Sequence, residues 1–194
     1  MNLNSLFNKQ QKLDEYIIKE KGLEDVDLLP RKTVALICEL YECVNEARFF
    51  KYWSEDTKPK GKMLTCQNCR IRVSDTGRYR EGDGHCNEIG DLYYHNPLLE
   101  EYVDTIHFTL SIANDLGYTS HEYTELQPMD LNELTLGITN IASTLHKFRT
   151  KKHIETLFNY VILLGYQLGF DEKMVIEAYH EKNKENYKRQ KAGY

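Results

Sequence analysis

The sequence predicts an all-α protein, a helical bundle interrupted by one long segment that is not helical. Apolar residues recur every three or four positions over most of the chain, which is the spacing that buries one face of a helix. This periodicity is lost between about residues 55 and 96, where turn-forming residues are dense. We therefore expect a single domain, residues 1–194, that carries an irregular insertion at about 55–96.

Six helices are expected, over residues 3–21, 31 to about 54, 97 to about 114, 131 to about 149, 152–168 and 172 to about 189. Gly22 is a stop signal for the first helix, and Pro30 is tolerated in the first turn of the second. Asp130 and Asp171 precede the fourth and sixth helices, where a carboxylate can accept hydrogen bonds from free backbone N–H groups. Within the insertion, residues 70–74 alternate as a short strand does.

The insertion contains cysteine and histidine residues with the spacing of a metal knuckle. Cys66 and Cys69 form a Cys-x-x-Cys pair, and Cys86 follows further along the chain. With His85 or His95 as a fourth ligand, these residues predict a tetrahedral zinc site. Free thiols in a loop, or a redox-active pair of the first two cysteines, are open alternatives. Outside the insertion, Cys38 and Cys43 follow a helical apolar pattern and are expected to be buried.

Charge and composition narrow the classes of function. The net charge of −5 argues against a general nucleic-acid-binding protein, which is usually basic. The longest apolar stretch, residues 160–164, is far too short to cross a bilayer, so no membrane association is expected. No N-terminal apolar run resembles a signal peptide, and we expect a cytoplasmic protein.

Two pairs of carboxylates are the strongest functional signal. Glu39 and Glu42 lie three residues apart in the second predicted helix, and Glu101 and Asp104 have the same spacing in the third. Positions i and i+3 share one face of a helix, so two packed helices would direct four carboxylates at one point. Such a group is costly unless a cation lies between its members. Mg²⁺ prefers oxygen ligands and binds beside phosphates, although a solvated acidic stripe is the alternative.

The C-terminal helix carries a second candidate surface. Lys182, Asn186 and Arg189 lie at positions i, i+4 and i+7, so they share one helical face. That face offers two cations for phosphates and an amide for a base or ribose. The alternative is a frayed, solvated helix whose lysines aid solubility.

Several stretches resemble a known family. Glu-x-x-Glu followed by Glu-x-x-Asp resembles the metal-binding signature of the MazG-like all-α nucleoside triphosphate pyrophosphohydrolases. Three further segments resemble the dimeric dUTPases within that group: residues 10–14, residues 45–53 with their Lys-x-Trp, and the C-terminal segment 179–194. The resemblance covers both ends and the middle of the chain but not the insertion.

The resemblance implies a Mg²⁺-dependent homodimer that hydrolyses dUTP, and also dUDP, to dUMP. It implies the following roles: Glu39, Glu42, Glu101 and Asp104 as metal ligands, Glu39 or its near neighbour Glu42 as the group that polarises water, Gln11, Trp53 and Asn186 around the uracil and deoxyribose, and Lys182 and Arg189 on the phosphates. The alternative for Trp53 is a place in the core, and His107 is expected to be structural. Hydrolysis of another nucleotide, or a non-catalytic module that binds a regulatory protein, are the alternative functions.

Overall fold

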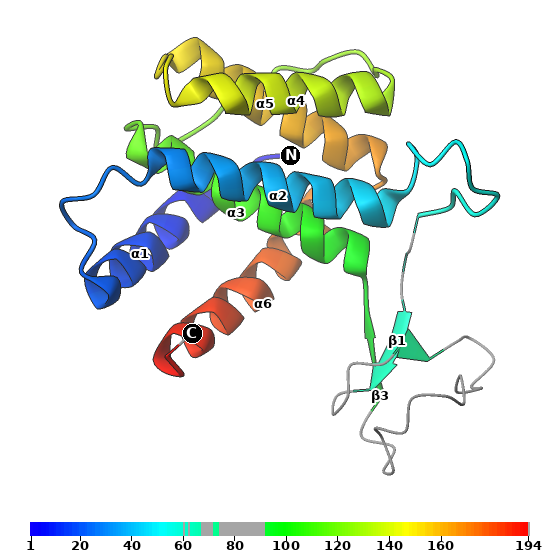
Figure 1. The fold of residues 1–194 in the computed structure, drawn as a ribbon, viewed down its shortest axis with the longest axis horizontal. Coiled ribbons are helices and arrows are strands. Elements are labelled where there is room, and N and C mark those ends of the chain that lie inside the picture. The colour runs from blue at the N-terminus through cyan, green and yellow to red at the C-terminus, as the bar shows by residue number, and fades with distance from the viewer. Residues whose placement is uncertain (60, 62, 67–71, 74–91, 194) are drawn as a thin grey trace.

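The computed structural model describes residues 1–59, 61, 63–66, 72–73 and 92–193, and in these ranges it is a helical bundle with a small sheet (Figure 1). The helices are α1 (Asn4–Lys21), α2 (Leu29–Ala47), α3 (Pro97–Asp115), α4 (Leu131–Leu145), α5 (Lys151–Gln167) and α6 (Glu172–Lys191). The strands are β1 (Met63–Cys66), β2 (Arg72–Val73) and β3 (Leu92–His95). The predicted all-α class is confirmed.

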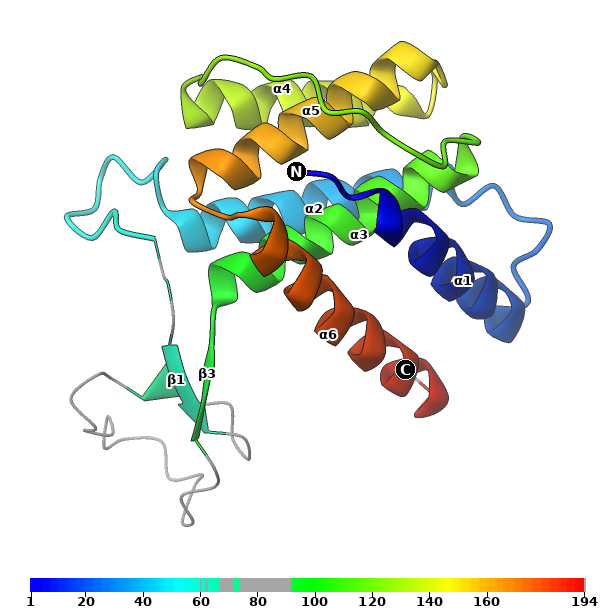
Figure 2. The ribbon, with the colours of Figure 1, turned by 180° about the vertical axis from the view of Figure 1, so that it is seen from behind.

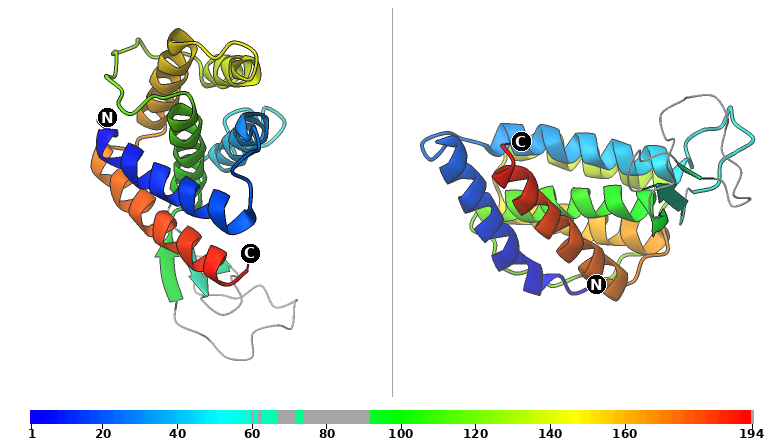
Figure 3. Two further views of the ribbon diagram at one scale, coloured as in Figure 1. Left: turned by 90° about the vertical axis from the view of Figure 1, so that its left-hand side faces the viewer. Right: turned by 90° about the horizontal axis from the view of Figure 1, so that it is seen from below.

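The helices lie in three layers of two, and the middle layer is the pair α2 and α3. Helices α2 and α3 run side by side in opposite directions, and α4 and α5 form a hairpin that covers one side of them (Figures 1 and 2). Helices α1 and α6 cover the other side and contact each other as well as α3 (Figure 3). This arrangement places the middle of α6 against α3, which the candidate site depends on.

Most helix ends follow local signals that the sequence carries. Gly22 ends α1 with φ 61°, a left-handed conformation that glycine adopts without strain, and its N–H bonds to the carbonyls of Ile18 and Lys19. The side chains of Asp130 and Asp171 accept hydrogen bonds from the first turns of α4 and α6, as predicted.

Two helices end earlier than predicted. Helix α2 ends at Ala47 and not near residue 54, because Arg48 turns the chain with φ 64°. Arg48 is held in this position by a 2.8 Å hydrogen bond from Nε to the carbonyl of Asp56. Helix α4 ends at Leu145 and not near residue 149. The apolar residues after each helix extend its sequence pattern although the backbone is no longer helical.

The three strands form an antiparallel sheet in the order β2–β1–β3. Its register pairs Met63 with His95 and Cys66 with Leu92, so the sheet joins the two ends of the insertion. Arg72 and Val73 confirm part of the strand predicted at 70–74. The predicted zinc ligands Cys69, His85 and Cys86 lie outside the described residues.

The core is formed by the apolar stripes of all six helices. Leu36, Leu40 and Cys43 of α2 are fully buried, as the helical spacing predicts. Cys38 is exposed, which corrects the expectation that it would be buried: it lies on the outward face of α2. Gly165 of α5 packs directly under the ring of Tyr102, leaving no space for a Cβ atom. Among the described helices, none is long and apolar enough to cross a membrane.

Candidate metal centre

Three carboxylates from two helices meet between α2 and α3. Glu39 and Glu42 are one turn apart on α2, and Glu101 is in the first half of α3. One oxygen from each lies within 4.8 Å of the others. The neighbouring residues Leu36, Leu40 and Cys43 are buried, so the packing of α2 orients its two glutamates toward α3. The predicted convergence therefore holds for three of the four carboxylates.

The electrostatics of this group favour a cation. Burial raises the pKa of Glu39 to about 7, and the charges of Asp104 and Glu42 contribute to this rise. Burial likewise raises the pKa of Glu101 to about 7, with contributions from Asp104 and Glu42. Carboxylates with raised pKa values are groups whose ionised form the folded chain disfavours. A divalent cation between them would remove that penalty.

Asp104 lies near this group but its side chain makes an ion pair instead. Its Oδ2 atom is 2.6 Å from the Nζ atom of Lys182 on α6. Burial raises the pKa of Asp104, and the charge of Lys182 acts against that rise. The same Nζ atom is 3.1 Å from Oε1 of Glu100. Glu100 is thus a fifth carboxylate of the region, and its position next to Glu101 is the sequence signal that would have found it.

The donor set fits Mg²⁺. Glu39, Glu42 and Glu101 supply hard oxygen atoms, which Mg²⁺ prefers over the nitrogen and sulfur atoms that Zn²⁺ accepts. One face of the group is open, because Glu42 is exposed. A metal ion held there would keep positions for water and for phosphate oxygens.

The residues predicted on α6 lie on the same side of the molecule as the carboxylates. Lys182, Asn186 and Arg189 are all partly buried, so this face of α6 is not a freely solvated surface. Arg189 forms an ion pair with Glu185 one turn earlier. The charge of Arg189 also lowers the pKa of Asp104, which indicates that it faces the acidic group.

Gln11 and Trp53 are not brought together within one chain. Gln11 is exposed on α1 and donates a 2.9 Å hydrogen bond to Glu15. Its helix contacts α2 near Lys32 in the first turn, whereas Trp53 comes after the last turn of α2, which ends at Ala47. The part of α2 from Lys32 to Ala47 is about 22 Å long. Trp53 is 65 % exposed, which excludes the alternative that it is a core residue of this chain.

A buried polar network around Gln10 was not predicted. Gln10 is only 4 % exposed, and its Oε1 atom accepts hydrogen bonds from Nδ1 of His107 at 2.7 Å and from the hydroxyl of Tyr179 at 2.8 Å. Its Nε2 atom donates to Asp14 at 2.8 Å. The sequence does indicate that Gln10 is buried, because it lies four residues after Leu6 and three before Leu13 on the apolar stripe of α1.

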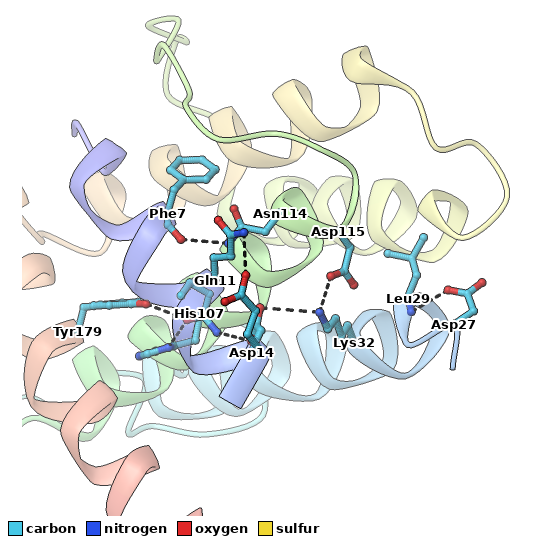
Figure 4. Close-up of polar contacts among 12 residues, drawn as sticks. Phe7, Gln11, Asp14, Asp27, Leu29, Lys32, His107, Asn114, Asp115 and Tyr179 are labelled. Atoms are coloured by element: carbon cyan, nitrogen blue, oxygen red, sulfur yellow. Dashed lines mark hydrogen bonds and ion pairs between the residues drawn. The ribbon is translucent and has the colours of Figure 1, made fainter. Parts of the chain in front are cut away.

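A second buried group adjoins this network. The Nζ atom of Lys32 on α2 lies 2.7 Å from Oδ1 of Asp115 and 3.8 Å from Oδ2 of Asp14, so one lysine links α1, α2 and α3 (Figure 4). Burial raises the pKa of Asp14, and the charge of Lys32 opposes that rise. Together the two networks fix α1 and α6 against α3, on the side of the bundle that carries the acidic group.

Comparison with known proteins gives a family match. The search of curated proteins found no match to the chain. A family model described as dUTPase matches residues 2–66 and 93–194, which is most of the chain. The matched ranges include all the carboxylates of the centre and the whole of α6, and they leave out most of the insertion. The chain therefore belongs to the all-α dUTPase family.

Proposed function

We propose that this chain is a Mg²⁺-dependent dUTP diphosphatase that converts dUTP to dUMP and pyrophosphate, and dUDP to dUMP and phosphate. The family match supports hydrolysis of dUTP in general. The observation that supports the metal-dependent mechanism is the convergence of Glu39, Glu42 and Glu101 within 4.8 Å. Oxygen ligands in this number and this spacing suit an ion that binds phosphates.

The chemistry divides between the acidic group and α6. Bound Mg²⁺ would neutralise charge on the phosphates and lower the pKa of a coordinated water. Glu39, which lies with Glu42 and Glu101 around the proposed metal position, is placed to accept the proton of the attacking water. Lys182 and Arg189 would bind phosphate oxygens through charge-assisted hydrogen bonds. Asn186 lies one turn after Lys182 and one turn before Arg189 on this face, and it would contact the deoxyribose or base.

The uracil site is proposed to require a homodimer. In one chain, Gln11 lies on α1 near the first turn of α2, and Trp53 comes after the last turn of α2. One base therefore cannot contact both residues of the same chain. The exposed indole of Trp53 would instead complete the site of a second copy. A mixture of Trp53→Ala and Glu42→Ala proteins, each inactive alone, would then regain activity through mixed dimers with one intact site. Continued inactivity of the mixture, with mixed dimers demonstrated, would rule out this arrangement.

The activity itself is tested with a panel of nucleotides. Purified protein with Mg²⁺ should hydrolyse dUTP and dUDP in preference to dCTP, dTTP and UTP, and EDTA should stop the reaction. Glu42→Ala should lower kcat/KM more than about 100-fold, which exceeds the loss typical of changes outside the ligand shell. Glu177→Ala, at an exposed glutamate of α6, is the matched control and should retain activity. A preference for dCTP, or activity that survives Glu42→Ala, would contradict the proposal.

Two further proposals concern a zinc site in the insertion and the location of the protein in the cell. A zinc ion held by Cys66, Cys69 and Cys86 with His85 or His95 would be detected as about one zinc per chain by atomic emission. A cytoplasmic location is proposed from the sequence and is tested by fractionation of the cells that make the protein.

A further inference from the structure

Lys182 occupies an unusual place for a lysine that is expected to bind phosphate. Its side chain is only 11 % exposed, and its Nζ atom lies 2.6 Å from Asp104 and 3.1 Å from Glu100. Both carboxylates belong to α3, whereas Lys182 belongs to α6. The ammonium group therefore already has two partners, and one of them, Asp104, is the residue predicted to be the fourth metal ligand.

The pairing has an electrostatic origin. Asp104 is 14 % exposed at its side chain, and Glu39 and Glu101 repel it. An anion buried in this way requires a positive partner, because leaving it without one is strongly destabilising. Lys182 is the cation that the structure places beside Asp104.

We propose that Lys182 is an exchangeable counter-ion of the metal centre. In the metal-free protein its ammonium group holds Asp104, and Mg²⁺ displaces it when Asp104 becomes a ligand. A carboxylate oxygen 2.6 Å from an ammonium cannot also bind a divalent cation without placing two like charges close together. The displaced ammonium, which has Glu100 as its remaining partner, can then turn toward the nucleotide phosphates. This inference rests on the proposed function, because it takes Mg²⁺ as the cofactor.

The exchange connects the metal to the position of the C-terminal helix. Lys182 lies one turn before Asn186 and two turns before Arg189 on one face of α6. Release of its ion pair with α3 would loosen the middle of α6, where the two helices otherwise pack. Metal binding would thus prepare the residues of α6 that are proposed to bind substrate, before the nucleotide arrives.

The first test measures Mg²⁺ affinity without nucleotide. Lys182→Met removes the competing charge, so the Kd for Mg²⁺, measured by calorimetric titration, should fall on the order of tenfold, a typical size for coupling between two ligands. Lys182→Arg keeps the charge and should bind Mg²⁺ as the wild type does. Lys184→Met, at a 66 % exposed lysine that pairs with Glu181, is the matched control and should not change the Kd. An unchanged or weaker affinity in Lys182→Met would overturn the inference.

The second test uses the wild-type protein and does not depend on the folding of a variant. An amine-modifying reagent should react slowly with Lys182 in the metal-free protein and several times faster once Mg²⁺ is added, as read by mass spectrometry. Lys184 serves as the internal reference and should react at the same rate in both conditions. If Lys182 stays protected while Mg²⁺ binds, there is no exchange. If the protein binds no Mg²⁺ and hydrolyses no dUTP, it is the proposed function that fails.

Discussion

The ring of His107 stacks on the ring of Tyr179, with their centroids 4.0 Å apart and their planes 13° from parallel. Both side chains donate a hydrogen bond to the same oxygen of Gln10, so α1, α3 and α6 meet at one point. Because that oxygen can only accept, the Nδ1 atom of His107 must carry the proton in this tautomer. The sequence expectation that His107 is structural agrees with this buried position.

The pKa of His107 predicts how the free energy of unfolding depends on pH. Burial, together with the charge of Lys182, lowers its pKa from 6.5 to about 3. Between these values the unfolded chain binds a proton that the folded chain does not, so the free energy of unfolding falls as the pH falls through this range. The contribution reaches about 1.4 kcal/mol per pH unit where the difference is one full proton.

Urea unfolding of wild type and His107→Phe at pH values from 4 to 8 would measure this contribution. Phenylalanine keeps the stacking on Tyr179 but cannot titrate. The variant should therefore lose less stability than the wild type as the pH falls. Equal pH slopes for the two proteins would show that His107 is not buried in its neutral form.

Gln10 and Gln11 form a matched pair of substitutions. Gln10→Ala removes the acceptor of two buried hydrogen bonds and should cost about 2–3 kcal/mol of unfolding free energy. Gln11→Ala, on the exposed face of α1, should change stability by less than about 0.5 kcal/mol. If Gln11 contacts uracil as proposed, its variant should instead raise the KM for dUTP. Thermal unfolding and kinetics on both variants separate the two roles, and equal stabilities would contradict the network.

Gly165 should not tolerate a side chain. A Cβ atom there would collide with the hydroxyl of Tyr102, which donates a 3.0 Å hydrogen bond to the carbonyl of Val161. Gly165→Ala should therefore destabilise the protein by about 1–3 kcal/mol through overpacking. Gly61→Ala, where no atom lies within 4 Å, is the control and should be close to neutral. Urea denaturation would measure both, and a neutral Gly165→Ala would show that Tyr102 can move.

Removing the charge of Glu39 should stabilise the protein in the absence of metal. Its pKa is raised from 4.5 to about 7, so the metal-free fold loses stability as the pH rises through that range. At pH 8, Glu39→Gln should raise the Tm of the metal-free protein on the order of 2 °C, a small value because water screens this half-buried group. Mg²⁺ should raise the Tm of the wild type but not that of the variant.

Scanning calorimetry with EDTA and then with excess Mg²⁺ would test both statements. Glu177→Gln removes an exposed charge of α6 and serves as the control. A lower Tm for metal-free Glu39→Gln would show that the charge of Glu39 does not destabilise the fold. An undiminished effect of Mg²⁺ on the variant would mean that Glu39 belongs to no metal centre.

The sequence predicted those features that depend on residues close together along the chain. The bounds of α1, the caps at Asp130 and Asp171 and the i, i+3 spacing of Glu39 and Glu42 are all local. A helical period, a carboxylate before a first turn or a glycine after a last one acts within a few residues. These features could therefore be predicted, and they were sufficient for the fold class and for the position of each carboxylate on its helix, whereas the packing of α2 against α3 decided that Glu101 meets Glu39 and Glu42.

Other features depend on contacts between distant segments, and only the tertiary structure decided them. The end of α2 at Ala47 follows from the turn at Arg48 and its bond to Asp56, although the apolar pattern continues past it. The pairing of Asp104 with Lys182 joins residues far apart in the chain, and the choice of Gln10 over Gln11 for the buried network depends on how α1 rotates against α3. Helix packing angles and rotations set these contacts, and no local pattern encodes them.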